Sequence, residues 1–302
     1  MAMAGMFVGP GSKTWDKVSA QKAAQLEKTG TDARKIWSET GTWKGPDGMW
    51  RQEIDDSAAR LTAGNVSAEQ MRKVNGGNWI KEQDFLREHY KTPEAKAIRT
   101  RASMRNGRVI NDDTPKLFDT VEHGLLSDAY PQLGGIRVAL DDKMPIGNAA
   151  YAEADNAIIM SPMKDADALS SKLHEVQHAI QQREGFAKGG APGANGLTWD
   201  ELTGEGRRIY ESSQKTYDDP ILKGLFEDAE PLKPWDEMTP ITRGPYMEQA
   251  QEGAYRRLAG EAEARATEKR LSLDATQRRA LFPEDSYDVP MNSLIIRGLL
   301  AK

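Results

Sequence analysis

Two histidines four residues apart, with a glutamate directly after the first, have the spacing most typical of a chemical site in this chain. In His174-Glu175-Val176-Gln177-His178 the histidines are one helical turn apart, so both imidazoles project from one side of a helix and can share a tetrahedral zinc ion. Glu175 lies about 100° further round and can reach a metal-bound water without becoming a ligand. The motif predicts zinc ligands at His174 and His178 and a catalytic base at Glu175, against the alternative of an incidental pair of surface histidines.

A zinc site needs a third protein ligand, and the composition limits the choice. The 302 residues contain no cysteine and four histidines, none of which follows His178. A carboxylate on a second helix is the remaining common solution. In LAGEAEARATEKRL small residues form a face that another helix can approach closely, and Glu261 lies on or beside that face. Glu261 is therefore favoured as the ligand, while Glu263 is expected to be exposed and stays an alternative.

The helix that carries the motif is predicted over about residues 166–184, and Gly185 ends it. One stripe of this helix is apolar and is predicted to face the core: Leu169, Leu173, Val176 and Ile180. His174 and His178 lie roughly 150° from the centre of that stripe, at 100° per residue. They are therefore expected to face a cleft or solvent.

The elements around the motif helix are predicted from apolar runs and turn residues. Between about 116 and 185 the expected order is helix, strand, strand, helix, with strands at 136–140 and 157–160. The second strand could bind an extended peptide along its edge. A further long helix is predicted to begin at Pro245 and to end at about residue 272.

The first 65 residues are predicted to form a small module of their own. Thr14 is expected to cap a first helix and Asp32 a second one that ends at Gly41. The turn sequence Gly45-Pro46-Asp47-Gly48 predicts a hairpin of two strands. Its compact core is expected to contain three tryptophans: Trp37, Trp43 and Trp50.

Residues 66–115 are predicted to form a helical, basic connecting segment. It opens with a capping box at Ser67 and Gln70 and ends in a basic stretch from Lys96 to Arg108. A solvated helix face is favoured over contact with nucleic acid or phosphate, because no aromatic residues are interleaved. The rest of the chain, 116–302, is predicted to form the domain with the motif and to contain a loop-rich insertion at about 186–245.

The overall composition gives no electrostatic reason to expect a nucleic-acid partner. Lys and Arg total 41 against 46 Asp and Glu, for a net charge of −5. The N-terminus lacks the pattern of a signal peptide, and no long apolar run is present. We therefore expect a protein without a membrane span that is made in the cytoplasm.

Several stretches of the chain resemble a known family. The zincin-like metallopeptidase domain found in large polyvalent proteins of phages and other mobile elements is similar to this chain at SDAYPQLGGIRV, NAIIMSP, KLHEVQHAIQQREGFAKGG, YRRLAGEAEARATEKRL and SYDVP. A segment that accompanies such domains resembles IWSETGTWKGPDGMWRQEIDDS. The match around the HEVQH helix is the most specific part.

The resemblance implies an α+β, zincin-like fold that is mostly helical, with a small sheet beside the HExxH helix. It also implies the gluzincin scheme, in which Zn²⁺ is held by His174, His178 and a glutamate of the later helix, and Glu175 is general base and acid. Other gluzincins carry an acid four residues after that glutamate, where it supports the first histidine. Glu261 fits this pattern, but Arg265 replaces the acid.

The function predicted from these observations is a zinc metallopeptidase that hydrolyses a peptide or protein substrate and is encoded by a phage or mobile element. Tyr246, Tyr255 and His123 are candidates for stabilising the oxyanion, and the sequence does not choose among them. One alternative is a virion or injected internal protein that uses a zincin fold for assembly with other virion proteins. Another is a toxin or anti-defence effector that cleaves one host protein. The expected location is the host cytoplasm or the virion.

Overall fold

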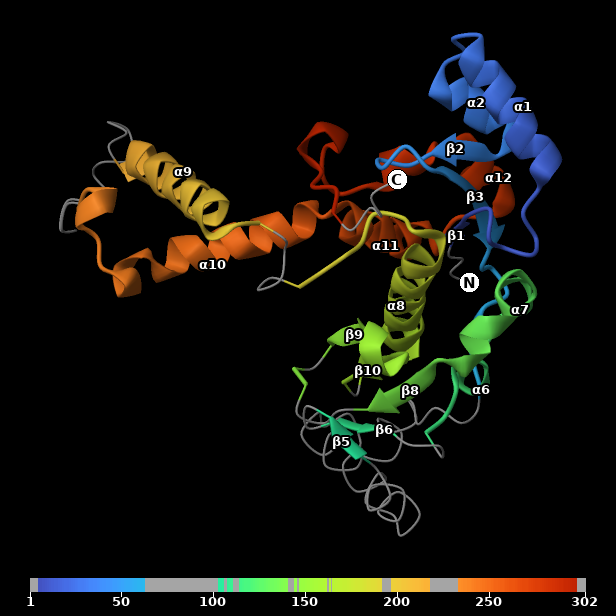
Figure 1. Ribbon diagram of the computed structural model, residues 1–302, viewed down its shortest axis with the longest axis horizontal. Helices are drawn as coiled ribbons and strands as arrows, with labels where there is room; N and C mark the ends of the chain where they lie inside the picture. Colours follow the sequence, from blue (N-terminus) through green and yellow to red (C-terminus); the bar gives the residue numbers. More distant parts are fainter. Residues whose placement is uncertain are drawn as a thin grey trace.

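The computed structural model describes residues 5–62, 103–105, 108–110, 114–140, 144–145, 147–161, 163, 165–191, 197–217 and 233–297. In these residues the fold is α+β, with several long helices and small sheets of two or three strands. The helix α8, Asp165–Glu184, runs between the sheets and carries the HExxH motif (Figure 1). No described helix has both the length and the apolar character needed to cross a membrane.

The helix predicted over 166–184 is confirmed as α8. Gly185 follows it with a φ of 71°, a left-handed conformation that glycine adopts without steric cost. The predicted apolar stripe also faces the core, since Leu173, Val176 and Ile180 are fully buried and Leu169 packs against the same cluster.

The first sheet has the order β1-β3-β2 and is antiparallel throughout. Its strands are β1 (Gly5–Val8), β2 (Thr42–Lys44) and β3 (Trp50–Asp55). The predicted hairpin is confirmed as β2 and β3. Strand β1 has no alternating pattern from which it could be predicted, because all four of its residues are buried and the strand contacts β3, α8 and α11.

Two helices precede the hairpin: α1 (Lys17–Lys28) and α2 (Ala33–Thr40). Asp32 caps α2 as predicted, and Gly41 ends it with a φ of 66°. The prediction of Thr14 as the first cap was wrong. The first helix begins later than expected, and the Asp16 carboxylate accepts hydrogen bonds from the N–H groups of Val18 and Ser19.

The core beneath this sheet is shared with the C-terminal part of the chain. Trp37 and Trp43 are buried as expected, but they pack with residues from several elements: Phe7, Ala262, Ala266, Phe282 and Tyr287. Trp50 is not part of this cluster, because it pairs across the hairpin with Lys44 and so lies on the opposite face from Trp43. Its ring instead contacts the Lys44 ammonium, 5.0 Å from the ring centroid. The expected domain boundary near residue 65 stays a prediction.

The second sheet lies beside α8 and has the order β8-β10-β9. Its strands are β8 (Arg137–Leu140), β9 (Ala149–Ala152) and β10 (Ala157–Met160). Two strands were predicted here, and β9 was missed because its small residues lack the β-branched and apolar pattern of a strand. Since β10 is the central strand, the sheet edge next to α8 is formed by β9.

The long helix predicted from Pro245 to about 272 is two helices, α10 (Pro240–Arg257) and α11 (Ala259–Arg270). The first begins early because the Thr239 side chain caps it and Pro240 fits its first turn. The helices separate at Leu258, where the extended C-terminal segment joins the backbone. Ile295 donates to the Arg257 carbonyl at 2.7 Å, and the Ala259 N–H donates to the Ile295 carbonyl at 2.9 Å.

The region predicted as a loop-rich insertion contains the helix α9, Trp199–Tyr217. With α10 it forms a helical arm that extends away from the rest of the structure (Figure 1). Gly206 of α9 is buried where a Cβ atom would lie 2.8 Å from the sulfur of Met247 in α10. It therefore permits the close approach of the two helices.

The prediction for residues 66–115 can be compared with the structure only at its end. Ser67 and Gln70 lie outside the described residues. The prediction of helical structure as far as Arg108 was wrong, because Ser103–Arg105 (β5) and Arg108–Ile110 (β6) pair as antiparallel strands. The sequence Asn106-Gly107 between them is typical of hairpin turns and outweighs the helical pattern.

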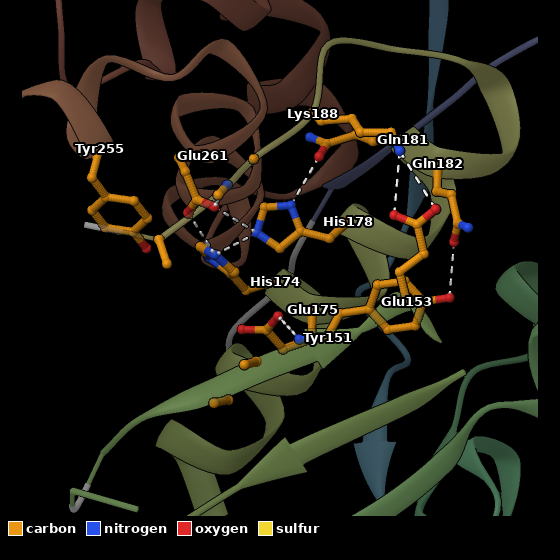
Figure 2. Close-up of a pocket in the computed structure, with 15 residues that line it drawn as sticks. Tyr151, Glu153, His174, Glu175, His178, Gln181, Gln182, Lys188, Tyr255 and Glu261 are labelled. Atoms are coloured by element: carbon orange, nitrogen blue, oxygen red, sulfur yellow. Dashed lines mark hydrogen bonds and ion pairs between the residues drawn. The ribbon is translucent and has the colours of Figure 1, made fainter. Parts of the chain in front are cut away.

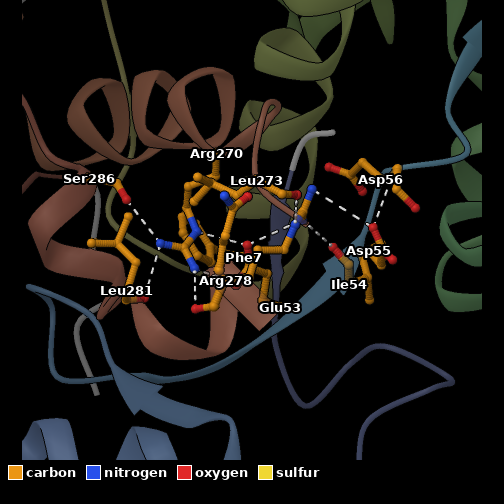
Figure 3. A network of polar contacts seen from close by, with 12 residues as sticks. Phe7, Glu53, Ile54, Asp55, Asp56, Arg270, Leu273, Arg278, Leu281 and Ser286 are labelled. Carbon is orange, nitrogen blue, oxygen red and sulfur yellow. Dashed lines mark hydrogen bonds and ion pairs between the residues drawn. The ribbon is translucent and has the colours of Figure 1, made fainter. Parts of the chain in front are cut away.

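A buried polar network attaches β3 to the C-terminal part of the chain (Figure 3). Arg270 of α11 donates two hydrogen bonds to the Glu53 carboxylate, at 2.8 and 2.7 Å, and a third to Ser286. Arg278 also donates to Glu53, at 3.3 Å. Further short strands and α-helices are β4 (Arg60–Leu61), which pairs with β7 (Val121–Glu122), α6 (Leu117–Thr120), α7 (Gly124–Ala129) and α12 (Ala275–Ala280).

A buried carboxylate should make the stability of this fold depend on pH. His123 accepts a hydrogen bond from the Leu126 N–H at Nδ1, so its Nε2 donates to Asp56 at 2.6 Å. Burial raises the pKa of Asp56 to about 6, although His123 opposes this shift. Because the pKa of Asp56 is higher in the folded state than in the unfolded state, protonation of Asp56 stabilises the fold. This stabilisation is fully present below the ordinary Asp pKa and is lost as the pH rises through the folded-state pKa of about 6.

We therefore expect the free energy of unfolding to fall by on the order of 2 kcal/mol as the pH rises from about 4 to about 7. Asp56→Asn should remove this part of the pH dependence. Urea unfolding of both proteins across that range measures it, and parallel curves for the two proteins would contradict the assignment.

Candidate metal centre

The Nε2 atoms of His174 and His178 point toward the same place. Their Nε2 atoms are 3.2 Å apart and their ring centroids 4.9 Å apart, with the ring planes at 78°. Both side chains are mostly buried and project from α8 into a pocket (Figure 2). Both imidazoles therefore project from one side of the helix, as the four-residue spacing predicted.

Glu261 reaches these histidines from α11, which packs directly on α8. Its carboxylate oxygens lie 3.5 Å from His174 Nε2 and 3.2 Å from His178 Nε2. The three potential ligand atoms lie within 4.8 Å of one another. Among the described residues this is the one cluster of His, Asp and Glu side chains that could hold a metal ion. The structure thus brings together the three residues predicted as ligands.

Glu263, the alternative ligand, is directed elsewhere. It is fully buried, where the sequence predicted exposure, and accepts hydrogen bonds from Arg51 Nε at 3.1 Å and Nη2 at 2.9 Å. The prediction of exposure was wrong because the N-terminal hairpin covers this face of α11, a contact that local sequence does not reveal.

The donor set fits a divalent cation. Glu261 Oε2 is buried and has no hydrogen-bond partner, which is costly for a carboxylate oxygen unless a ligand satisfies it. Burial opposes ionisation of Glu261, but the two histidines hold its pKa well below the ordinary range. Burial would likewise lower the pKa of His174, but the neighbouring carboxylates of Glu261 and Glu268 raise it to about 10. The site therefore stabilises positive charge where the three side chains meet.

The inner ring nitrogens of both histidines are held by acceptors. His178 Nδ1 bonds to Gln181 Oε1 at 2.8 Å, and Gln181 in turn donates to the Gly260 carbonyl at 2.9 Å. His174 Nδ1 bonds to the Glu268 carboxylate. In the neutral rings these contacts place the proton on Nδ1 and leave the Nε2 lone pair free to bind a metal ion.

Glu268 supplies the carboxylate that bonds to the first histidine, which the sequence pattern lacked at position 265. Arg265 occupies the expected position, but it turns away and pairs with Asp288 through two bonds of 2.9 Å. Glu268 follows Glu261 by seven residues, which is two helical turns, so both face α8. Sequence reasoning missed Glu268 although this spacing could have identified it.

Glu175 lies beside the histidines and does not join the three-residue cluster. It is almost fully buried, and its Oε2 accepts a hydrogen bond from the Tyr151 N–H at 2.6 Å. Burial raises the pKa of Glu175, while the nearby histidines lower it. A carboxylate with a raised pKa is suited to accept and then release a proton near neutral pH.

The pocket in front of these groups has a volume of about 290 Å³. One wall is strand β9, and the opposite wall is the glycine loop, by which we mean residues 187–190. The lining also contains the three clustered side chains and several polar groups: Tyr151, Glu153, Glu175, Gln181, Gln182, Lys188 and Tyr255. Lys188 and Glu153 form an exposed ion pair of 3.2 Å between the two walls (Figure 2).

The three candidates for oxyanion stabilisation separate clearly in the structure. Tyr255 lines the pocket, and burial together with the charge of Glu261 raises the pKa of its hydroxyl, which therefore stays protonated. Tyr246 packs against Tyr210 in the helical arm, with ring centroids 5.4 Å apart. His123 is bonded to Asp56. Tyr255 is thus the candidate that lies at the site.

The N-terminal segment has a counterpart among known families. Residues 5–62 match the family model described as large polyvalent protein associated domain 23. This match supports the expected polyvalent-protein context, and it ends well before the HExxH helix. No curated protein and no solved structure matched the chain.

The glycine loop can approach the candidate ligands because two glycines meet there. A Cβ atom on Gly260 would lie 2.2 Å from the backbone nitrogen of Gly189 and 2.3 Å from the carbonyl carbon of Lys188. A Cβ atom on Gly189 would lie 2.3 Å from Glu261 Oε1. The loop and α11 therefore touch backbone to backbone directly above the site.

We expect Gly260→Ala to destabilise the protein by about 1–3 kcal/mol, since the loop or the helix must move to admit the methyl group. Gly253→Ala is the matched control, because Gly253 is also helical and has open space around its Cβ position. The control should be neutral or stabilise by about 0.5–1 kcal/mol. Urea unfolding measures both, and equal stability of the two variants would contradict the close contact.

Proposed function

We propose that this protein is a zinc-dependent metallopeptidase with a zincin-like fold. The convergence of His174 and His178 of α8 with Glu261 of α11, next to Glu175, is the observation that carries the proposal. Two imidazoles and a carboxylate form a donor set typical of catalytic zinc, which keeps one coordination position open.

The arrangement of elements around the site supports the zincin-like fold. A helix with the motif lies beside the edge strand of a small sheet, and a second helix supplies a carboxylate across a close interface. Fold class alone does not establish an activity, so the site carries the functional argument.

The chain would hold zinc through His174 Nε2, His178 Nε2 and the Glu261 carboxylate, with Glu268 and Gln181 orienting the imidazoles. Zinc bound in this way would polarise a water molecule and the scissile carbonyl as a Lewis acid.

Glu175 has the position and environment of the general base. Its carboxylate faces the pocket next to the histidines and can take a proton from the attacking water on one oxygen. The same carboxylate can then give that proton to the leaving amine. The hydrogen bond from the Tyr151 N–H keeps the other oxygen, Oε2, in a fixed position.

The edge of β9 suits an extended peptide. The Tyr151 N–H points toward Glu175, away from β10, so by the alternation of antiparallel pairs the backbone groups of Ala149 also point away from β10. Both residues line the pocket. A peptide added beside them would place a backbone carbonyl near Glu175 and the Tyr255 hydroxyl, which could donate to a developing oxyanion.

The N-terminal match supports the context that we propose for the protein. Because residues 5–62 match a domain associated with large polyvalent proteins, we place this peptidase in a phage or mobile element. The substrate class is peptide or protein, and other virion proteins are potential partners.

Metal analysis of the purified protein tests the first part of the proposal. We expect about one zinc ion per chain, lost in His174→Ala and Glu261→Ala. Glu268→Gln should retain zinc with an affinity lower by about 10- to 100-fold, because the support of His174 is weakened. Zinc content that is substoichiometric and unchanged by all three substitutions would rule out the site.

A peptidase assay with zinc-loaded protein tests the second part. Glu175→Gln should keep its zinc and lose hydrolysis by about 10²- to 10⁴-fold, because the general base is removed. Tyr255→Phe should lower kcat by about 10²-fold with little change in KM, since its contact forms in the transition state. A wild-type protein that binds zinc but cleaves no peptide or protein would instead support the role in virion assembly.

A further inference from the structure

A buried arginine of the N-terminal hairpin links two carboxylates from distant parts of the chain. Arg51 is fully buried and forms paired hydrogen bonds with Glu263 of α11 and with Asp47 of its own hairpin. The bonds to Asp47 are 2.7 and 2.8 Å long. Since Arg51 neutralises part of this buried charge, removing it would leave two carboxylates without a counter-ion.

The network continues from Glu263 to the motif helix. Glu263 Oε1 also accepts a hydrogen bond from Gln177 Nε2 at 3.0 Å. Gln177 directly precedes His178, and its amide bonds to both the N–H and the carbonyl of Phe7 in β1. The residue before one candidate ligand, Gln177, and the residue two positions after another, Glu263, are therefore both tied to the N-terminal sheet.

The other branch of the network holds the glycine loop. Asp47 Oδ2 accepts a hydrogen bond from the Ala187 N–H at 2.8 Å, and the Arg51 guanidinium lies 3.8 Å from the Phe186 ring centroid. At its far end the loop touches the site itself, since the Gly190 N–H donates to Glu261 Oε1 at 2.8 Å. One cation thus anchors both α11 and the loop that contacts its carboxylate.

We infer that Arg51, within the matched segment 5–62, is a positioning residue of the metal centre: through Glu263 and Asp47 it sets where Glu261 lies relative to His174 and His178. The inference rests on the proposed zinc site. The segment associated with polyvalent proteins would then be a structural part of the catalytic unit.

Ligand geometry explains why the position of Glu261 should affect zinc affinity. Zinc–ligand distances vary by only about 0.2 Å between good sites, so small displacements of one ligand weaken binding strongly. Glu261 and Glu263 lie on the same short helix, and a shift of α11 that relieves an unpaired Glu263 would move Glu261 as well. The motif helix alone cannot correct such a shift.

Arg51→Met in the whole 302-residue chain is the direct test, with Arg278→Met as the matched control. Arg278 is also a buried arginine bonded to β3, through Glu53, but its hydrogen bonds reach neither α8 nor the glycine loop. Zinc affinity is measured by competition with a chelator, and ligand geometry by the visible absorption of Co²⁺ bound in place of zinc. Thermal unfolding of the metal-free proteins shows the general loss of stability.

We expect Arg51→Met to weaken zinc binding at least tenfold and to change the Co²⁺ spectrum. Arg278→Met should retain the wild-type affinity and spectrum at a similar loss of thermal stability. Equal zinc affinity and identical spectra for both variants and the wild type would overturn the inference while leaving the zinc site intact. Absence of zinc binding in the wild type would overturn the proposed function and, with it, the inference.

A second variant keeps the test decisive if Arg51→Met does not fold. Asp47→Ala leaves the pair of Arg51 and Glu263 in place and removes the anchor of the Ala187 N–H. It should weaken zinc binding severalfold and shift the Co²⁺ spectrum, because the loop contact to Glu261 is loosened. Unchanged affinity and spectrum in this variant would also count against the inference.

Discussion

The close packing of α11 on α8 is the interaction on which the candidate site depends. Two imidazoles on one helix and a carboxylate on another can meet only if the helix backbones come near each other and stay in register. Gln181 of α8 donates a hydrogen bond to the Gly260 carbonyl of α11 at 2.9 Å. Gly260 also lets the glycine loop touch α11 directly beside Glu261. A buried carboxylate without such partners would be strongly unfavourable, so the same contact that creates the site also makes it tolerable.

The sequence predicted the parts of this site that depend on local periodicity. The four-residue spacing of the histidines and the apolar stripe of α8 both follow from helix geometry, and both are present. Glu261 was predicted from the small residues around it. Strand β9 was missed because its alanines are poor strand formers. The burial of Glu263 was missed because it depends on contact with Arg51, which lies far away in the chain. Propensity has no information about such contacts.

The support of His174 shows a different limit of sequence reasoning. The expected acid four residues after Glu261 is replaced by Arg265, which taken alone argues against a complete site. In the structure the carboxylate comes from Glu268, one helical turn beyond the position of Arg265. Both spacings place an acid on the face of α11 that meets α8. The physical requirement is therefore an acidic side chain that points toward α8. An acid four residues after Glu261 is only one way to meet it.

His178 and Glu261 are far apart in the chain but can belong to one compact site. Hydrogen bonds hold both ends of the segment between them, where the chain leaves the site and where it comes back. The glycine loop leaves the site held by Asp47 and by the Arg297 carbonyl, which accepts from the Lys188 N–H at 3.0 Å. The chain returns at Leu258, where Ile295 bonds to the residues on either side of the helix break. The arm of α9 and α10 lies between these anchors and brings Tyr255 to the pocket at its base. Since the break separates α10 from α11, the length and composition of the arm can vary without moving Glu261, whereas a continuous helix would transmit every change in the arm directly to the ligand.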